Sequence, residues 1–173
     1  MVMTMTRHVS ALGRLGVTAV CLVITSMGLP AAPGPKNIIV IQPSSPVGIT
    51  EYKAEYETGQ SAQGINHALS YTNRGRSRIS AVRFGLVAFD VFNGFLGKME
   101  GIVMADVNVN RSSRGSWGQA PPAAFSFLTS VAYVDTVRFE DGTIWQADVE
   151  TIVEELRKID KTFDAKRLKP PTP

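Results

Sequence analysis

The sequence is poor in the side chains on which thiol enzymes and most zinc proteins depend. Its 173 residues include one cysteine, Cys21, and two histidines, His8 and His67. Cys21 and His8 both fall within the first 31 residues, so the rest of the chain has one histidine and no thiol. This excludes thiol catalysis, a disulfide within the remaining chain, and zinc sites built from cysteines or several histidines. The sequence therefore predicts no metal site and no cofactor.

Other features are also missing. No serine lies in a Gly-x-Ser-x-Gly nucleophile elbow, and no repeat of fixed period is visible. The apolar run at residues 15–29 is shorter than the roughly 20 residues that a transmembrane helix needs. We therefore expect no stable membrane span in the processed protein.

Residues 1–31 have instead the layout of a secretory signal peptide. Arg7 and Arg14 precede the apolar run, no acidic residue is present, and Pro30 and two alanines follow. We predict cleavage between Ala31 and Ala32 and a secreted or periplasmic protein. A leader that is kept as a membrane anchor is the alternative.

The charge of the remaining chain is close to neutral. The formal net charge of the full sequence is +3, and removing residues 1–31 removes two arginines and no acid. An excess of one positive charge excludes nucleic-acid binding driven by net charge. A chain of this length buries about two thirds of its unfolded surface, which is enough for a fold without disulfides.

Composition divides the chain after the leader into three parts. Residues 32–46 predict an N-terminal strand and a linker with two prolines, and residues 47–160 predict a β-sandwich domain that ends in a helix. Residues 161–173 form a basic, proline-terminated tail.

The centre of the predicted sandwich is a hairpin. Residues 79–92 are apolar at both odd and even positions, which predicts a strand covered on both faces, with a bulge at Gly85. Asn93-Gly94 then separates this strand from a second one, and this dipeptide favours a tight turn. A second hairpin is predicted at Asp141-Gly142. A two-residue turn there pairs Phe139 with Ile144 and Arg138 with Trp145, so that Arg138 stacks on the indole.

The last predicted element is an amphipathic helix. Asp148 is a helix-capping residue, and Val149, Ile152, Val153 and Leu156 then form one apolar stripe. We expect this helix to cover the face that carries Trp145.

Short strands joined by turns and followed by one helix predict a mainly β fold. The predicted architecture is an antiparallel, immunoglobulin-like β-sandwich of about seven or eight strands with one C-terminal amphipathic helix. The segment VRFEDGTIW, which follows a long two-faced strand, resembles small secreted bacterial domains of the immunoglobulin-like or fibronectin-like type. The resemblance spans roughly residues 37–147; it implies this fold and a binding role but transfers no functional residues.

The strongest candidate site is the segment from Arg111 to Pro122. Its serines, glycines and prolines predict a long loop that carries Trp117 beside Arg111 and Arg114. We interpret these three residues as a ligand-binding set that stacks on a sugar or anchors a protein. The alternative is that Trp117 folds back and closes one end of the sandwich.

A second candidate is an anion-binding patch of Arg74, Arg76 and Arg78, whose alternate spacing would place them on one side of an extended segment. The alternative is a solvated turn.

The leading functional hypothesis is a secreted or periplasmic, non-enzymatic binding or interaction module whose partner is an envelope protein or a glycan. One alternative is an envelope hydrolase that uses His67, or a carboxylate pair from Asp90, Asp106 and Asp135. Another is a structural subunit whose sheet edges add strands to a partner. We expect a packed, structural role for His67.

Overall fold

The computed structural model describes residues 34–58 and 63–168, so the predicted leader at residues 1–31 lies outside the described residues. In this part the chain forms eight strands, one α-helix and two short 3-10 helices. None of the helices in these ranges is long and apolar enough to cross a membrane. The strands are β1 (Lys36–Ile39), β2 (Val47–Thr58), β3 (Gln63–Asn73), β4 (Ile79–Asp90), β5 (Phe95–Val107), β6 (Ser112–Gln119), β7 (Phe127–Phe139) and β8 (Ile144–Gln146). The helices are η1 (Ala124–Ser126), α1 (Val149–Arg157) and η2 (Ala165–Leu168).

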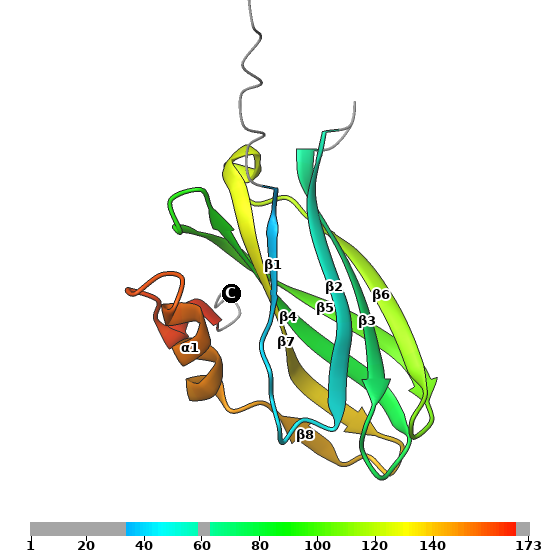
Figure 1. Ribbon diagram of the computed structural model, residues 1–173. Helices are drawn as coiled ribbons and strands as arrows, with labels where there is room; N and C mark the ends of the chain where they lie inside the picture. Colours follow the sequence, from blue (N-terminus) through cyan, green and yellow to red (C-terminus); the bar gives the residue numbers. More distant parts are fainter. Residues whose placement is uncertain (1–33, 59–62, 169–173) are drawn as a thin grey trace, which may run out of the picture. The chain divides into compact units, whose positions relative to one another are not determined.

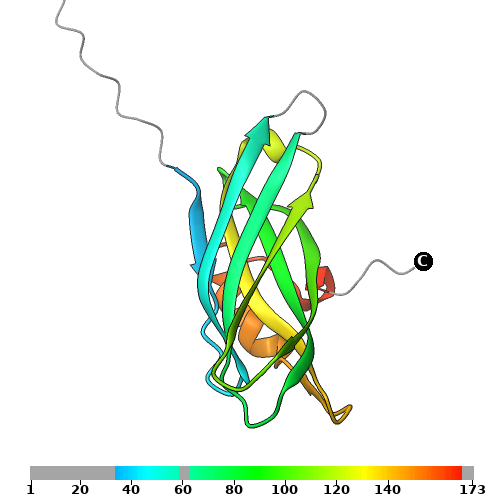
Figure 2. The ribbon, with the colours of Figure 1, turned by 90° about the vertical axis from the view of Figure 1, so that its right-hand side faces the viewer.

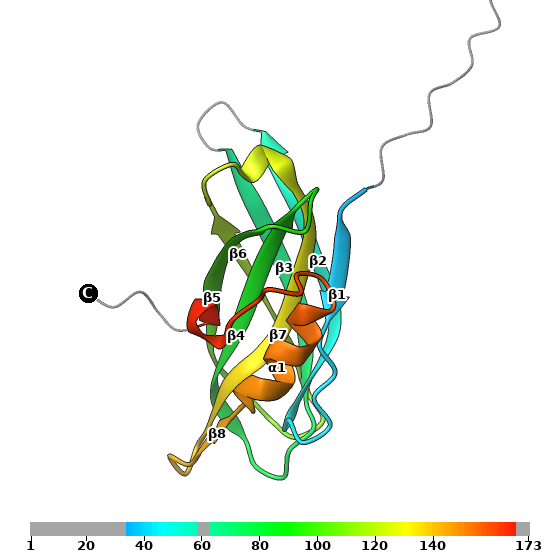
Figure 3. The ribbon, with the colours of Figure 1, turned by 90° about the vertical axis from the view of Figure 1, so that its left-hand side faces the viewer.

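The strands form two sheets that pack face to face (Figure 1). Sheet A has the order β1-β7-β4-β5, with β8 on β7, and sheet B has the order β2-β3-β6, seen from its own side in Figure 2. Helix α1 lies on the face of sheet A that is turned away from sheet B (Figure 3). The mainly β sandwich with a C-terminal helix is confirmed. One pair departs from the antiparallel prediction, because β1 runs parallel to β7.

Strand β4 contributes to two cores, as its apolar residues of both parities predict. One set faces sheet B: Val82, Phe84, Leu86 and Ala88. Val87 and Phe89 face the other way and pack with Ile152 and Leu156 of α1. A strand with apolar cover on both sides holds its neighbours in a fixed register, because a slip of one residue would exchange the two faces.

Gly85 in β4 is not a bulge. It pairs in register with Glu100 of β5 and with Tyr133 of β7. A Cβ atom at this position would lie 2.0 Å from Cζ of Tyr133, so the Tyr133 ring occupies the space above the glycine. An aromatic ring that covers a glycine across strands is a recognised stabilising pair in sheets.

The prediction of a loop at residues 111–122 is wrong over most of this segment. Residues 112–119 instead form β6 at the edge of sheet B. Its residues alternate in burial, with Ser113, Gly115, Trp117 and Gln119 on the more buried side. Serine and glycine fill five of the eight positions, so this two-residue period does not show as an apolar pattern. Pairing with β3 supplies the order that the local sequence does not predict.

The hairpin between β7 and β8 has a different register from the predicted one. Arg138 pairs with Ile144 and Val137 with Trp145, and Gly142 has a φ of 85°. The connection is therefore one residue longer than a two-residue turn, which moves every side chain of β8 to the opposite face. Trp145 packs against the core between the sheets, so it does not stack on Arg138 and α1 does not cover it.

The helix and its cap agree with the prediction, and the packed part of the chain continues past residue 160. The Asp148 side chain accepts a hydrogen bond from the Glu150 amide, at 3.2 Å. Phe163 and Leu168 are buried in the same cluster as Leu156. We call the apolar cluster between sheet A and α1 the outer core. Described residues 161–168 are therefore part of the fold, because Phe163 supplies an aromatic side chain to this outer core.

Candidate functional site

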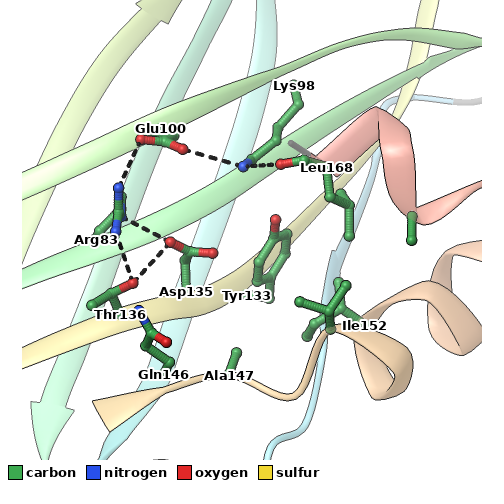
Figure 4. A pocket seen from close by; sticks show the side chains of 12 residues that line it. Arg83, Lys98, Glu100, Tyr133, Asp135, Thr136, Gln146, Ala147, Ile152 and Leu168 are labelled. Atoms are coloured by element: carbon green, nitrogen blue, oxygen red, sulfur yellow. Dashed lines mark hydrogen bonds and ion pairs between the residues drawn. The ribbon is translucent and has the colours of Figure 1, made fainter. Parts of the chain in front are cut away.

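A cavity of about 280 Å³ lies between the outer face of sheet A and the chain that follows β8 (Figure 4). Strands β4, β5 and β7 provide its polar wall, with Arg83, Lys98, Glu100 and Asp135. The opposite wall is mostly apolar and comes from α1, η2 and the residues before α1, with Ala147, Val149, Ile152, Ala165 and Leu168. Pockets for small molecules typically measure about 300 to 1,000 Å³, so this one suits a small group.

The polar wall is a chain of ion pairs. Arg83 Nε lies 2.8 Å from Asp135 Oδ2, and its Nη1 lies 3.4 Å from Glu100 Oε2. Lys98 Nζ lies 3.3 Å from Glu100 Oε1 and donates a hydrogen bond to the Leu168 carbonyl at 2.6 Å. Burial alone would raise the pKa of Glu100, but its hydrogen bonds and the charges of Lys98 and Arg83 lower that pKa overall.

Tyr133 lies at the centre of this wall. The residue is 2% exposed, and its hydroxyl has no hydrogen-bond partner among the described residues. Figure 4 shows the ring inside the arc of charged side chains. Burial, and then the charges of Asp135 and Glu100, raise the pKa of Tyr133, so the hydroxyl stays protonated and remains a hydrogen-bond donor.

Towards β8, none of the described helices lies over the part of the outer face of sheet A that continues from the pocket, whose lining includes Arg83, Thr136 and Gln146. The strand registers place two rows of side chains across this face. The first row is Ile144, Arg138, Ala81 and Met104, and the second is Gln146, Thr136, Arg83 and Ile102. Met104 is 85% exposed, Ile144 57% and Ile102 54%. We call these two rows the uncovered face.

The structure separates the three residues of the predicted ligand-binding set. Trp117 points between the sheets, where its ring lies 6.0 Å from that of Phe84. Cβ atoms at Gly101 and Gly115 would lie within 3 Å of the indole, so the ring fills the space between β5 and β6. Arg114 lies on the opposite, exposed side of β6, and Arg111 is exposed just before the strand. The arginines therefore do not flank the indole.

The three arginines of the predicted anion patch have different surroundings. Arg78 is paired with Asp106 at 2.5 Å and lies 3.7 Å from Glu140. The Arg74 guanidinium lies against Gly48 of β2, and Arg76 is exposed in the turn. The segment is not extended here, because it forms the bend between β3 and β4.

His67 belongs to a buried polar chain that links the two sheets. With its proton on Nε2, the imidazole donates to Gln119 Oε1 at 3.1 Å, and Nδ1 accepts from the Tyr52 hydroxyl at 2.8 Å. The Tyr52 hydroxyl in turn accepts from the Ser130 hydroxyl on sheet A. Burial lowers the pKa of His67 to about 4. The imidazole is fully buried and both its nitrogens are bonded, as expected for a structural histidine.

We expect the protein to lose up to about 3 kcal/mol of unfolding free energy as the pH falls from 6.5 to about 4. In this range the unfolded chain protonates His67, whereas the folded chain keeps it neutral. Protonation therefore favours the unfolded state, and stability increases with pH. Urea denaturation at pH 7 and pH 4.5 measures the loss, and His67→Gln should show a smaller one. An equal loss in both proteins would mean that His67 does not carry the effect.

The three carboxylates considered for hydrolysis lie at different positions along the strands of sheet A. Asp90 accepts from the Phe92 and Gly94 amides, Asp106 pairs with Arg78, and Asp135 pairs with Arg83. Asp90 lies opposite Phe127 of β7 in the sheet. Asp135 is eight positions further along β7, so about 26 Å of strand separates the levels of Asp90 and Asp135. Carboxylates that act together on a glycosidic bond lie within about 10 Å of each other. In residues 34–58 and 63–168, no three His, Cys, Asp or Glu side chains are grouped to hold a metal ion.

No protein-family model and no curated protein matches the chain. One solved X-ray structure of a hypothetical protein from Peptoclostridium difficile 630 is similar over 68% of this chain and 92% of that chain, with a TM-score of 0.49 and 10% identity. A likeness of this degree carries no conclusion about fold or function. The resemblance to immunoglobulin-like domains stays a prediction.

Sequence reasoning found Asp135 but missed the other residues of the pocket. A usable signal was present, because Arg83, Lys98 and Glu100 interrupt otherwise apolar strands. Charged residues within such strands need partners, and all three lie on the outer face of sheet A.

Proposed function

We propose that the protein is a non-enzymatic binding module outside the cytoplasm that holds a polypeptide partner on its uncovered face. One observation carries this proposal: Met104 and Ile102 are exposed side by side at the β5 edge of this face and Ile144 is exposed on β8 at its other edge, next to a pocket. Large apolar side chains that gather on an exposed sheet typically mark an interaction surface.

The composition of the uncovered face favours a protein over a glycan. Methionine and arginine are enriched at protein interfaces, and Arg138 lies between Ile144 and Ala81 in the first row. Glycan sites commonly use an exposed aromatic ring, and neither row contains one. The buried position of His67 supports a binding role over hydrolysis, and the apolar leader supports an extracytoplasmic location.

Site-specific photo-crosslinking in cells that export the protein tests this proposal. A benzophenone amino acid at position 104 should give a protein adduct, whereas the same group at Lys53, exposed on sheet B, should give none. Ile102→Asp should abolish the adduct and leave the unfolding curve nearly unchanged, since position 102 is exposed. Equal adducts from both positions, or no adduct from position 104, would contradict the proposal.

A further inference from the structure

The pocket beside the uncovered face holds hydrogen-bonding groups that the fold leaves free. Tyr133 lines the cavity and is 2% exposed as a residue, but its hydroxyl is not among the enclosed polar atoms of the described residues, and it makes no hydrogen bond to a described residue. Asp135 uses one carboxylate oxygen, Oδ2, for Arg83 and Thr136, and the other oxygen has no partner in the described part of the chain. In Figure 4 this second oxygen is directed towards Tyr133. The hydroxyl and the free carboxylate oxygen therefore face the cavity without a partner from the fold and are available to a ligand.

These two groups require complementary chemistry in a ligand. A protonated hydroxyl has a proton to donate to a carbonyl oxygen, and an ionised carboxylate only accepts, from an N–H group. A peptide backbone provides carbonyls and N–H groups at short spacing. Tyr133 and Asp135 are two positions apart on β7, Asp135 falls at the irregularity in the pairing with β4, and both residues line the pocket.

The charges of the pocket select against an ionised ligand. Arg83 and Lys98 balance Glu100 and Asp135, and all four charges are engaged in ion pairs. The Lys98 side chain is only 9% exposed and bonds to the Leu168 carbonyl as well. A carboxylate or an ammonium group would have to break one of these pairs, whereas a neutral amide breaks none.

The opposite wall determines the rest of the ligand. Its side chains are aliphatic, from Ala147, Val149, Ile152, Ala165 and Leu168. With about 280 Å³ available, the cavity has room for one aliphatic side chain and its adjoining peptide groups.

We propose that this pocket binds an aliphatic residue of a polypeptide, with a backbone carbonyl accepting from Tyr133 and a backbone N–H donating to Asp135. The inference rests on the proposed function, because it places one residue of the partner beside the uncovered face. It assigns to Tyr133 and Asp135 a recognition role that does not depend on the exposed side chains of that face.

The test is an NMR titration of the exported protein with N-acetyl-L-leucinamide, a neutral aliphatic residue with two amide groups. Saturable shifts should appear in β7 and α1. Tyr133→Phe removes only the hydroxyl and should weaken binding by about three- to tenfold. Tyr71→Phe, a matched change in the core between the sheets, should leave the affinity unchanged. Ala165→Leu fills the cavity and should abolish the shifts.

Two comparison ligands test the required chemistry. N-acetylglycinamide lacks the side chain, and free leucine carries both charges, so each should bind more weakly than N-acetyl-L-leucinamide. Equal binding of free leucine, no saturable shifts with the leucinamide, or an unchanged affinity in Tyr133→Phe would overturn the inference. None of these results bears on photo-crosslinking from position 104, so the inference and the proposed function fail separately.

Discussion

Gly85→Ala is expected to lower the free energy of unfolding by about 4 kcal/mol or more. The new Cβ would lie 2.0 Å from Cζ and 2.3 Å from the hydroxyl oxygen of Tyr133. The ring is buried in the outer core and Gly85 lies in the middle of β4, so neither side moves without disturbing strand pairing. Urea denaturation of the variant and the parent measures the effect.

A double-mutant cycle shows whether the ring is the cause. Tyr133→Ala alone costs several kcal/mol, but in that background Gly85→Ala should cost less than about 1 kcal/mol, because the space above residue 85 is empty. Gly118→Ala is a matched control, since a Cβ at Gly118 meets nothing within 4 Å. If Gly85→Ala is as mild as Gly118→Ala, the contact with Tyr133 is not a determinant of stability.

Trp117→Ala is expected to cost about 3 to 4 kcal/mol of unfolding free energy, towards the lower end of the range for a large aromatic side chain removed from a core, because the indole is partly buried. The indole packs against Phe84 and fills the gap between Gly101 and Gly115, and its N–H lies 3.4 Å from the Ile102 carbonyl. Its removal would leave a cavity along the line where β5 and β6 meet. Arg114→Ala, on the exposed side of β6, should change stability by less than about 0.5 kcal/mol.

Fluorescence gives an independent measurement. In a Trp145→Phe background, Trp117 should emit at short wavelength and be shielded from iodide. A quenchable indole together with an unchanged unfolding curve for Trp117→Ala would restore the interpretation of Trp117 as an exposed binding residue.

Patterns within single elements predicted much of this fold. The two-faced strand from Ile79, the turn near Asn93 and the capped helix after Asp148 all follow from local residue types. The turn at Asn93-Gly94 is longer than expected, since Asn93 has a φ of 64° and the Asp90 amide donates to the Gly94 carbonyl. Local sequence sets the position of a turn more firmly than its length.

What the sequence did not predict depends on partners distant in the chain. Strand β6 forms because β3 pairs with it, and Trp145 changes face because of one extra residue in a turn. The pocket needs Tyr133 of β7, Lys98 of β5 and Leu168 of η2, which are far apart in sequence. Only the folded chain brings these side chains together.

The parallel pairing of β1 with β7 limits where the predicted leader could be removed. Residues 36–39 cover the edge of β7 from Thr129 to Ala132, and the Val40 amide also donates to the Ala132 carbonyl. A cut between Ala31 and Ala32 leaves this strand whole, whereas a cut after Ile39 would expose a row of unpaired amides and carbonyls on β7, a strand whose residues contribute to both apolar cores. Exposed edges of this kind recruit strands from other molecules and start aggregation. Proteolytic trimming past Ile39 would thus produce a domain prone to self-association.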